Sequence, residues 1–252
     1  MKRRAIPVTL GVVAVVAFLA CAACSSSRRV ARADSKVVPP NEILDFDALY
    51  GQNCAGCHGM EGSGGAAIAL ANPVFLAIAD DTVIRHTASN GVPGTPMPAF
   101  AQSAGGMLTD KQIEAIVHGI RSWTKPGALG DQTPPPYSAQ VPGDPERGAD
   151  AYRTYCSSCH GADGRGSNKA SSIVNGSYLA LVSDQQLRTI VIAGRPELDA
   201  PDWRGDVEGR SMSAQEVSDV VAWLSAQRPK FPGQPYPTAS TSAAHGGSLD
   251  EY

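Results

Sequence analysis

The segment Cys54-Ala55-Gly56-Cys57-His58-Gly59 returns further along the chain as Cys156-Ser157-Ser158-Cys159-His160-Gly161, and this pair of segments decides the fold. Their first cysteines lie 102 residues apart. Other residues repeat at the same offset, in the pairs Tyr50 and Tyr152, Gly62 and Gly164, and Gly64 and Gly166. Because self-similarity at a fixed period is the mark of repeated structural units, the sequence predicts two tandem domains.

Shifts in composition mark where the two predicted domains begin and end. We place the domains at residues 41–127 and 144–231, joined by a Pro-rich linker over residues 128–143. A Ser- and Arg-rich tether over residues 25–40 precedes them, and a tail of mostly Pro, Ser and Gly follows over residues 232–252. Such segments have little to bury, so we expect a stiff linker and a disordered tail.

Apolar residues in both domains recur at helical rather than alternating spacing. Near the C-terminal end of each domain, the residues with this spacing are Ile113, Ile116, Val117 and Ile120 in the first, and Val217, Val220, Val221 and Leu224 in the second. A capping box precedes each set, formed by Thr109 with Gln112 and by Ser213 with Glu216. Neither domain offers a convincing pair of strands, so we predict an all-α fold.

The first 24 residues are typical of a bacterial export signal. The basic run Lys2-Arg3-Arg4 is followed by an apolar core over residues 8–19 and by small residues. The ending Cys21-Ala22-Ala23-Cys24 resembles the lipobox of bacterial lipoproteins, in which cleavage leaves a lipidated Cys. We favour Cys24 as the lipid anchor, with Cys21 and an ordinary cleaved signal as alternatives. In each case the folded part is expected outside the cytoplasm.

The overall charge excludes several functions. The chain of 252 residues carries a formal net charge of -3 at pH 7, which excludes a generic nucleic-acid binder and a disordered polyelectrolyte. Because the signal holds bases and no acid, the remainder is more acidic than the whole. Beyond residue 24, no stretch approaches the ~18 apolar residues that a membrane-spanning helix needs, so we expect the rest of the chain to be soluble.

The folded part holds four cysteines, all of them in the two Cys-x-x-Cys pairs. A thioredoxin-like redox pair should follow a strand in a βαβ unit, which is missing here. A zinc site or structural disulfides would leave the adjacent His58 and His160 without a role. Covalent haem uses every residue, because two thiols add to the haem vinyl groups and the next His binds the iron. We therefore predict two haem c groups, held by Cys54, Cys57 and His58 and by Cys156, Cys159 and His160.

With these motifs, each half of the chain resembles a class I cytochrome c. The whole resembles a diheme, membrane-anchored bacterial cytochrome c, with the similarity covering roughly residues 42–125 and 144–228. The resemblance implies two small all-helical domains, each around a covalently bound haem. In such a domain an N-terminal helix crosses a C-terminal helix beside the haem.

Residue sizes at the two expected crossings are complementary. The first domain has Phe46 before its Cys-x-x-Cys-His segment and Gly119 in its last helix, whereas the second has Gly148 and Trp223 at the matching places. Since close helix approach needs one small partner, we predict that Phe46 packs on Gly119 and that Gly148 packs on Trp223.

The resemblance also implies a distal iron ligand, usually a Met in a loop before the last helix. In the first domain Met97 lies between Pro96 and Pro98, which stiffen its loop, and we predict that Met97 binds the first iron. His86 and His118 are then surplus. We expect both to be ordinary surface or core residues.

The second domain departs from this pattern. Ala200 stands where Met97 stands, and alanine cannot bind iron. Met212 is the tentative ligand, although it aligns with Leu108 just before the last helix and can equally fill the core there. The alternative is a vacant or water-bound iron, and His245 in the tail is a remote third option.

A thioether opposite a histidine raises the haem potential, which suits electron transfer. The resemblance therefore implies a periplasmic or outer-face electron-transfer protein, rather than an enzyme, with redox donor and acceptor proteins as partners and no nucleic acid. Membrane oxidoreductase complexes of a respiratory-type chain are the expected partners, approached through the lipid anchor. Two alternatives stay open: a haem enzyme or gas- or peroxide-binding protein with an open second haem, and the cytochrome subunit of a dehydrogenase or quinol-oxidising complex.

Overall fold

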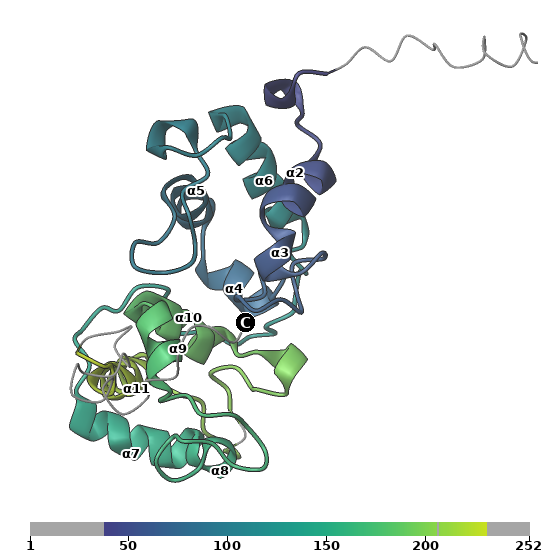
Figure 1. Cartoon of the computed structure of the whole chain (residues 1–252). Coiled ribbons are helices and arrows are strands. Elements are labelled where there is room, and N and C mark those ends of the chain that lie inside the picture. Colours follow the sequence, from purple (N-terminus) through teal and green to yellow (C-terminus); the bar gives the residue numbers. More distant parts are fainter. Residues whose placement is uncertain (1–37, 206, 231–252) are drawn as a thin grey trace, which may run out of the picture. The chain divides into compact units, whose positions relative to one another are not determined.

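The computed structural model describes residues 38–205 and 207–230 (Figure 1). Regular structure in these ranges is helical, with isolated β-bridges and no strand, which confirms the predicted all-α class. Among the same residues, no helix is both long and apolar enough to cross a membrane. The predicted export signal with Cys21 and Cys24, most of the tether, and the tail with His245 lie outside the described residues.

Two runs of helices follow one another in the same order, after a short 3-10 helix η1 (Pro40–Glu42). The first repeat consists of α2 (Phe46–Asn53), α3 (Ala55–His58), α4 (Pro73–Ile78), α5 (Asp81–Asn90), the 3-10 helix η2 (Gln102–Ala104) and α6 (Asp110–Ser122). The second repeat consists of α7 (Pro145–Tyr155), α8 (Ser157–His160), α9 (Gly176–Leu181), α10 (Asp184–Ala193), the 3-10 helix η3 (Pro196–Leu198) and α11 (Ala214–Ala226). In each repeat a one-turn helix follows the first helix directly.

Equivalent polar side chains begin the helices of both repeats. The Gln112 N–H donates to the Thr109 hydroxyl at 3.3 Å, and the Glu216 N–H donates to the Ser213 hydroxyl at 3.2 Å. Both capping boxes predicted from the sequence are complete and are therefore confirmed. Matching caps begin the earlier helices, at Asp45 and Asp144 and at Asn72 and Asn175. Each cap contributes about 1 kcal/mol to its helix.

The first and last helices of each repeat approach closely at a glycine. A Cβ placed on Gly119 of α6 would lie 1.9 Å from the Phe46 ring of α2. A Cβ placed on Gly148 of α7 would lie 2.7 Å from the Trp223 Cβ and 2.0 Å from the Asp219 carbonyl oxygen, both on α11. Both predicted large-to-small pairs are confirmed, because neither crossing has room for a methyl group.

Replacing Gly148 by alanine should destabilise the second repeat. The new methyl group would overlap the main chain of α11, so the two helices would have to separate. Overpacking of this kind typically costs about 1–3 kcal/mol, which denaturant unfolding of the haem-loaded protein would measure. Gly51→Ala in α2 is the matched control, because its Cβ meets nothing within 4 Å. Equal stability of the two variants would contradict the close crossing.

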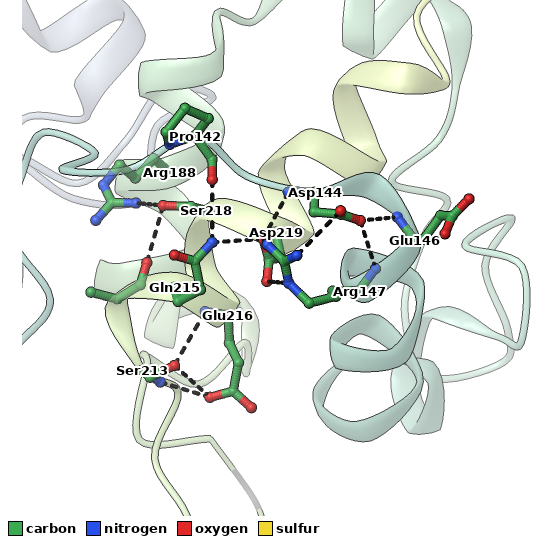
Figure 2. Close-up of polar contacts among 11 residues, drawn as sticks. Pro142, Asp144, Glu146, Arg147, Arg188, Ser213, Gln215, Glu216, Ser218 and Asp219 are labelled. Carbon is green, nitrogen blue, oxygen red and sulfur yellow. Dashed lines mark hydrogen bonds and ion pairs between the residues drawn. The ribbon is translucent and has the colours of Figure 1, made fainter.

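A buried carboxylate joins α7 to α11 (Figure 2). The Asp219 side chain accepts hydrogen bonds from Arg147 Nε and Nη2, both at 2.9 Å. It also accepts from the Asp144 main-chain N–H at 2.7 Å and from Gln215 Nε2 at 2.8 Å. Burial disfavours the charged form, but these donors outweigh burial and lower the pKa of Asp219 below its ordinary value. The ionised carboxylate therefore stabilises this helix crossing.

Asp219→Asn should lower the free energy of unfolding at neutral pH by roughly 1–3 kcal/mol, as expected for hydrogen bonds to a charged group. The pKa of Asp219 is lower in the folded than in the unfolded state, where it lies near about 3.9. The stabilisation is therefore complete above that value and is lost as the pH falls through it toward the folded pKa. Denaturant unfolding at neutral and acid pH would show the difference between wild type and variant shrinking in acid.

Asp150→Asn is the control for this experiment. Asp150 pairs with Arg153 on the same helix, and both side chains are exposed. Exposed pairs contribute little to stability, so this variant should resemble the wild type at every pH. A pH-independent effect of Asp219→Asn would contradict the role of the charge.

Part of the predicted linker packs on the second repeat. Buried Arg188 of α10 donates to the Pro136 carbonyl at 2.9 Å and to the Tyr137 carbonyl at 3.0 Å. Gln185 Nε2 also donates to the Tyr137 carbonyl, at 2.9 Å. Hydrogen bonds from α10, as well as prolines, therefore restrict this segment.

Candidate functional site

Each Cys-x-x-Cys-His segment forms a single helical turn directly after the first helix of its repeat. The His58 N–H donates to the Cys54 carbonyl at 3.0 Å, and the His160 N–H donates to the Cys156 carbonyl at 2.9 Å. Residues four apart lie on one side of a helical turn. The first thiol and the imidazole of each segment are therefore neighbours on one face.

The glycine that ends each turn adopts a backbone conformation that is nearly exclusive to glycine. Gly59 has φ 83° and ψ 154°, and Gly161 has φ 80° and ψ 164°. A tyrosine hydroxyl from the preceding helix donates to each glycine carbonyl, from Tyr50 at 2.9 Å to Gly59 and from Tyr152 to Gly161. Both tyrosines stand out in the sequence repeat, but spacing alone assigned them no role.

Main-chain carbonyls orient the two histidines. His58 Nδ1 lies 2.8 Å from the Ile68 carbonyl oxygen, and His160 Nδ1 lies 2.8 Å from the Ser171 carbonyl oxygen. With the proton on Nδ1, this hydrogen bond leaves the Nε2 lone pair to bind a metal. Burial lowers the pKa of His58 and favours the neutral ring that metal binding needs. Sequence reasoning missed Ile68 and Ser171, because any residue can supply a main-chain carbonyl.

The four cysteines in the described residues form no disulfide. Burial, helped by the paired cysteine, raises the pKa of Cys54 and that of Cys156 to about 11. Within residues 38–205 and 207–230, no three His, Cys, Asp or Glu side chains gather closely enough to form a metal site of their own.

This donor set fits haem c. Each repeat combines two unpaired thiols on one helical turn with a neighbouring imidazole whose Nδ1 is already hydrogen-bonded. Thioether bonds to a porphyrin and ligation of its iron by Nε2 require these groups. The six residues that the sequence predicts for this role lie in or directly before these two helical turns: Cys54, Cys57, His58, Cys156, Cys159 and His160.

Met97 lies in a loop that hydrogen bonds hold in place. The Val92 N–H donates to the Met97 carbonyl at 3.0 Å, and the Met97 N–H donates to the Thr95 hydroxyl at 3.2 Å. The Met97 side chain is half-buried, whereas Met60 and Met107 are 73% and 82% exposed. Of these three methionines of the first repeat, Met97 is the one with a half-buried side chain. The surplus histidines of this repeat are exposed, as expected of surface residues: His86 and His118.

The second repeat has no methionine in the equivalent loop. Ala200 follows η3 there and is half-buried. Met212 lies in the apolar core just before the capping box of α11, and only 6% of it is exposed. The two repeats therefore share their thiols and histidines but differ in this loop, where the first has Met97 and the second has Ala200.

The family described as cytochrome c oxidase, cbb3-type, subunit III matches the chain at residues 41–118 and again at residues 143–224. Each match contains one Cys-x-x-Cys-His segment, and together they cover more than half of the chain. The duplication seen in the sequence and in the helices is therefore also a duplication of this family's domain.

The individual relatives share less than a third of their aligned residues with this chain. The chain is 27% identical over 136 residues to the Cbb3-type cytochrome c oxidase subunit FixP of Sinorhizobium medicae, covering 48% of this chain and 40% of that protein. It is 23% identical over 200 residues to the cytochrome bc1 complex cytochrome c subunit of Corynebacterium efficiens, covering 74% of this chain and 63% of that protein. The chain thus spans less than two thirds of either relative.

Among solved structures, one from the Kuenenia stuttgartiensis reducing HAO-like protein complex aligns with a TM-score of 0.42 at 20% identity. The alignment covers 77% of this chain and 100% of the other.

Proposed function

Because this chain belongs to the cytochrome c family of the cbb3-type oxidase subunit III, we propose that it is a diheme electron-transfer protein of a respiratory-type chain. The observation that carries the proposal is the duplicated site. Both repeats present two unpaired thiols and an imidazole whose Nδ1 is hydrogen-bonded to a main-chain carbonyl. When bound, haem c supplies a one-electron iron couple.

Each residue of the proposed site in the first repeat has a role of its own. Cys54 and Cys57 would hold the cofactor covalently, and His58 would bind the iron. The hydrogen bond from His58 Nδ1 to the Ile68 carbonyl fixes the ring and makes Nε2 a stronger ligand. The Met97 thioether would also bind the iron, where it would favour the reduced state and raise the reduction potential. In the second repeat Cys156, Cys159 and His160 have the corresponding roles.

We propose redox proteins as the donor and acceptor, with membrane oxidoreductase complexes as the main partners. The names of the two relatives support this choice, because one is a subunit of an oxidase and the other belongs to a bc1 complex. The proposal includes a lipid anchor at Cys24, or at Cys21, that would keep the protein at the outer face of the membrane or in the periplasm.

The experiment that tests this function uses the full chain after haem attachment. Intact mass and haem absorbance give the number of haems per chain, and voltammetry gives the redox couples. We expect two covalent haems and two reversible one-electron couples. A peroxide-turnover assay on the same sample tests the enzymatic alternative, for which we expect no sustained activity. Fewer than two haems, or irreversible couples, would contradict the proposal.

A further inference from the structure

We propose that the second repeat binds a small neutral diatomic molecule at its haem iron, in the position that Met97 fills in the first repeat. The inference rests on the proposed function, because it requires a haem held by Cys156, Cys159 and His160. It replaces the tentative assignment of Met212 as the second distal ligand.

The loop of Ala200 follows the same path as the loop of Met97. The Arg195 N–H donates to the Ala200 carbonyl at 2.9 Å, as the Val92 N–H donates to the Met97 carbonyl at 3.0 Å. A second pair of hydrogen bonds also matches. In the second repeat the Leu198 N–H donates to the Arg195 carbonyl at 2.8 Å, and in the first repeat the Thr95 N–H donates to the Val92 carbonyl at 3.2 Å. Every residue in these pairs differs from its counterpart by the same 103 positions.

Contacts of a glycine at the start of each loop confirm the alignment. A Cβ on Gly91 would lie 2.5 Å from the Pro98 carbonyl carbon, and a Cβ on Gly194 would lie 2.6 Å from that of Pro201. Pro98 and Pro201 directly follow Met97 and Ala200 in the sequence. The loops are therefore in register on both sides of this position, and no slip brings another residue into the place of Met97.

Met212 occupies a packing position instead. Its N–H donates to the Trp203 carbonyl at 2.8 Å, as the Leu108 N–H donates to the Phe100 carbonyl at 2.8 Å. Met212 and Leu108 are each 6% exposed within the apolar core. Leucine has no atom that binds iron, so this position serves packing in the first repeat. Met212 therefore packs in the core of the second repeat as Leu108 does in the first.

Other side chains of this loop do not replace the thioether. Glu197 forms an ion pair with Arg195, and Asp202 forms one with Arg204. Apart from Met212, the described part of the loop holds no thioether and no imidazole. Cleavage of peroxide needs a group to move protons, whereas a neutral diatomic molecule such as carbon monoxide needs only an open iron and space. Because alanine is smaller than methionine and has no atom that binds iron, we infer that this position leaves the iron open.

Carbon monoxide added to the dithionite-reduced, haem-loaded full chain tests the inference, with haem per chain measured on the same sample. We expect one carbon monoxide bound for every two haems. Ala200→Met restores a thioether and should lower the carbon monoxide affinity at least tenfold without changing the haem content. Met212→Leu removes the only other thioether of the second repeat and should bind as the wild type does.

The outcomes separate this inference from the proposed function. Fewer than two haems in the wild type would contradict the function itself. Two haems with no carbon monoxide binding would overturn the inference alone, and binding gained in Met212→Leu would then identify Met212 as the ligand. Unchanged affinity in Ala200→Met, at full haem content, would also overturn it. If that variant fails to fold, the wild type and Met212→Leu still decide the question.

Discussion

Replacing Cys54 and Cys57 together by serine should reduce the covalent haem content of the mature chain from two groups to one. Serine hydroxyls do not form the thioether bonds that join the porphyrin to the chain, so His58 alone would have to retain the cofactor. Because each repeat is small and rich in glycine, its core depends on the bound cofactor for stability. We therefore expect the first repeat to lose stability as well. Intact mass and haem absorbance after denaturation measure the covalent content.

The matched control is the same pair of substitutions in the second repeat. The double variant of Cys156 and Cys159 should also retain one haem, but that haem should be the one opposite Met97. The two variants should therefore have equal haem content and different spectra, and only the variant of the first repeat should bind carbon monoxide. Two covalent haems in either variant would show that the thiols are not the attachment points.

Met97→Ala should have the second large effect, because it makes the first site resemble the second. Loss of the thioether removes the ligand that favours reduced iron, so the reduction potential of this centre should fall. We expect a fall on the order of 100 mV, within the range of about 0.8 V that axial ligands set. The carbon monoxide bound per chain should rise from one to two. Voltammetry and gas titration measure these two quantities.

Met107→Ala is the control for this variant, because Met107 belongs to the same repeat and is 82% exposed. Its potentials and gas binding should match those of the wild type. If Met97→Ala keeps both wild-type couples, another residue binds the first iron, and Met107 and Met60 would be the next to replace.

Two kinds of feature could be predicted from the sequence: those that depend on neighbours along the chain, and those that appear when the two copies of the repeat are aligned. Both capping boxes formed where Thr109 and Ser213 stand, since a cap needs only a side chain three residues from its partner. The crossings at Gly119 and Gly148 were also predictable. When the two repeats are aligned, the large residue lies on the first helix in one repeat and on the last helix in the other, with a glycine at the matching place each time.

The features that could not be predicted involve groups that meet through space. The Ile68 and Ser171 carbonyls orient the histidines, and a main-chain oxygen leaves no trace in residue type. The hydrogen bond from Arg147 to Asp219 depends on the helix crossing that brings the two side chains together. No feature of the surrounding sequence indicates this bond. The hydrogen bonds that hold the linker come from Arg188, which reaches back about 50 residues along the chain.

The sequence by itself determined the attachment chemistry, since thiols and imidazole on one helical turn are a local arrangement. It also determined the helical class, because the spacing of apolar residues sets which face of each helix is buried. Only the tertiary structure placed Met212. Its sequence position allowed both packing and ligation, and the structure shows its N–H bonded to the Trp203 carbonyl and its side chain buried in the core, which supports our proposal that it packs. A residue's role at such a site depends on which atoms surround it, and those atoms come from distant parts of the chain.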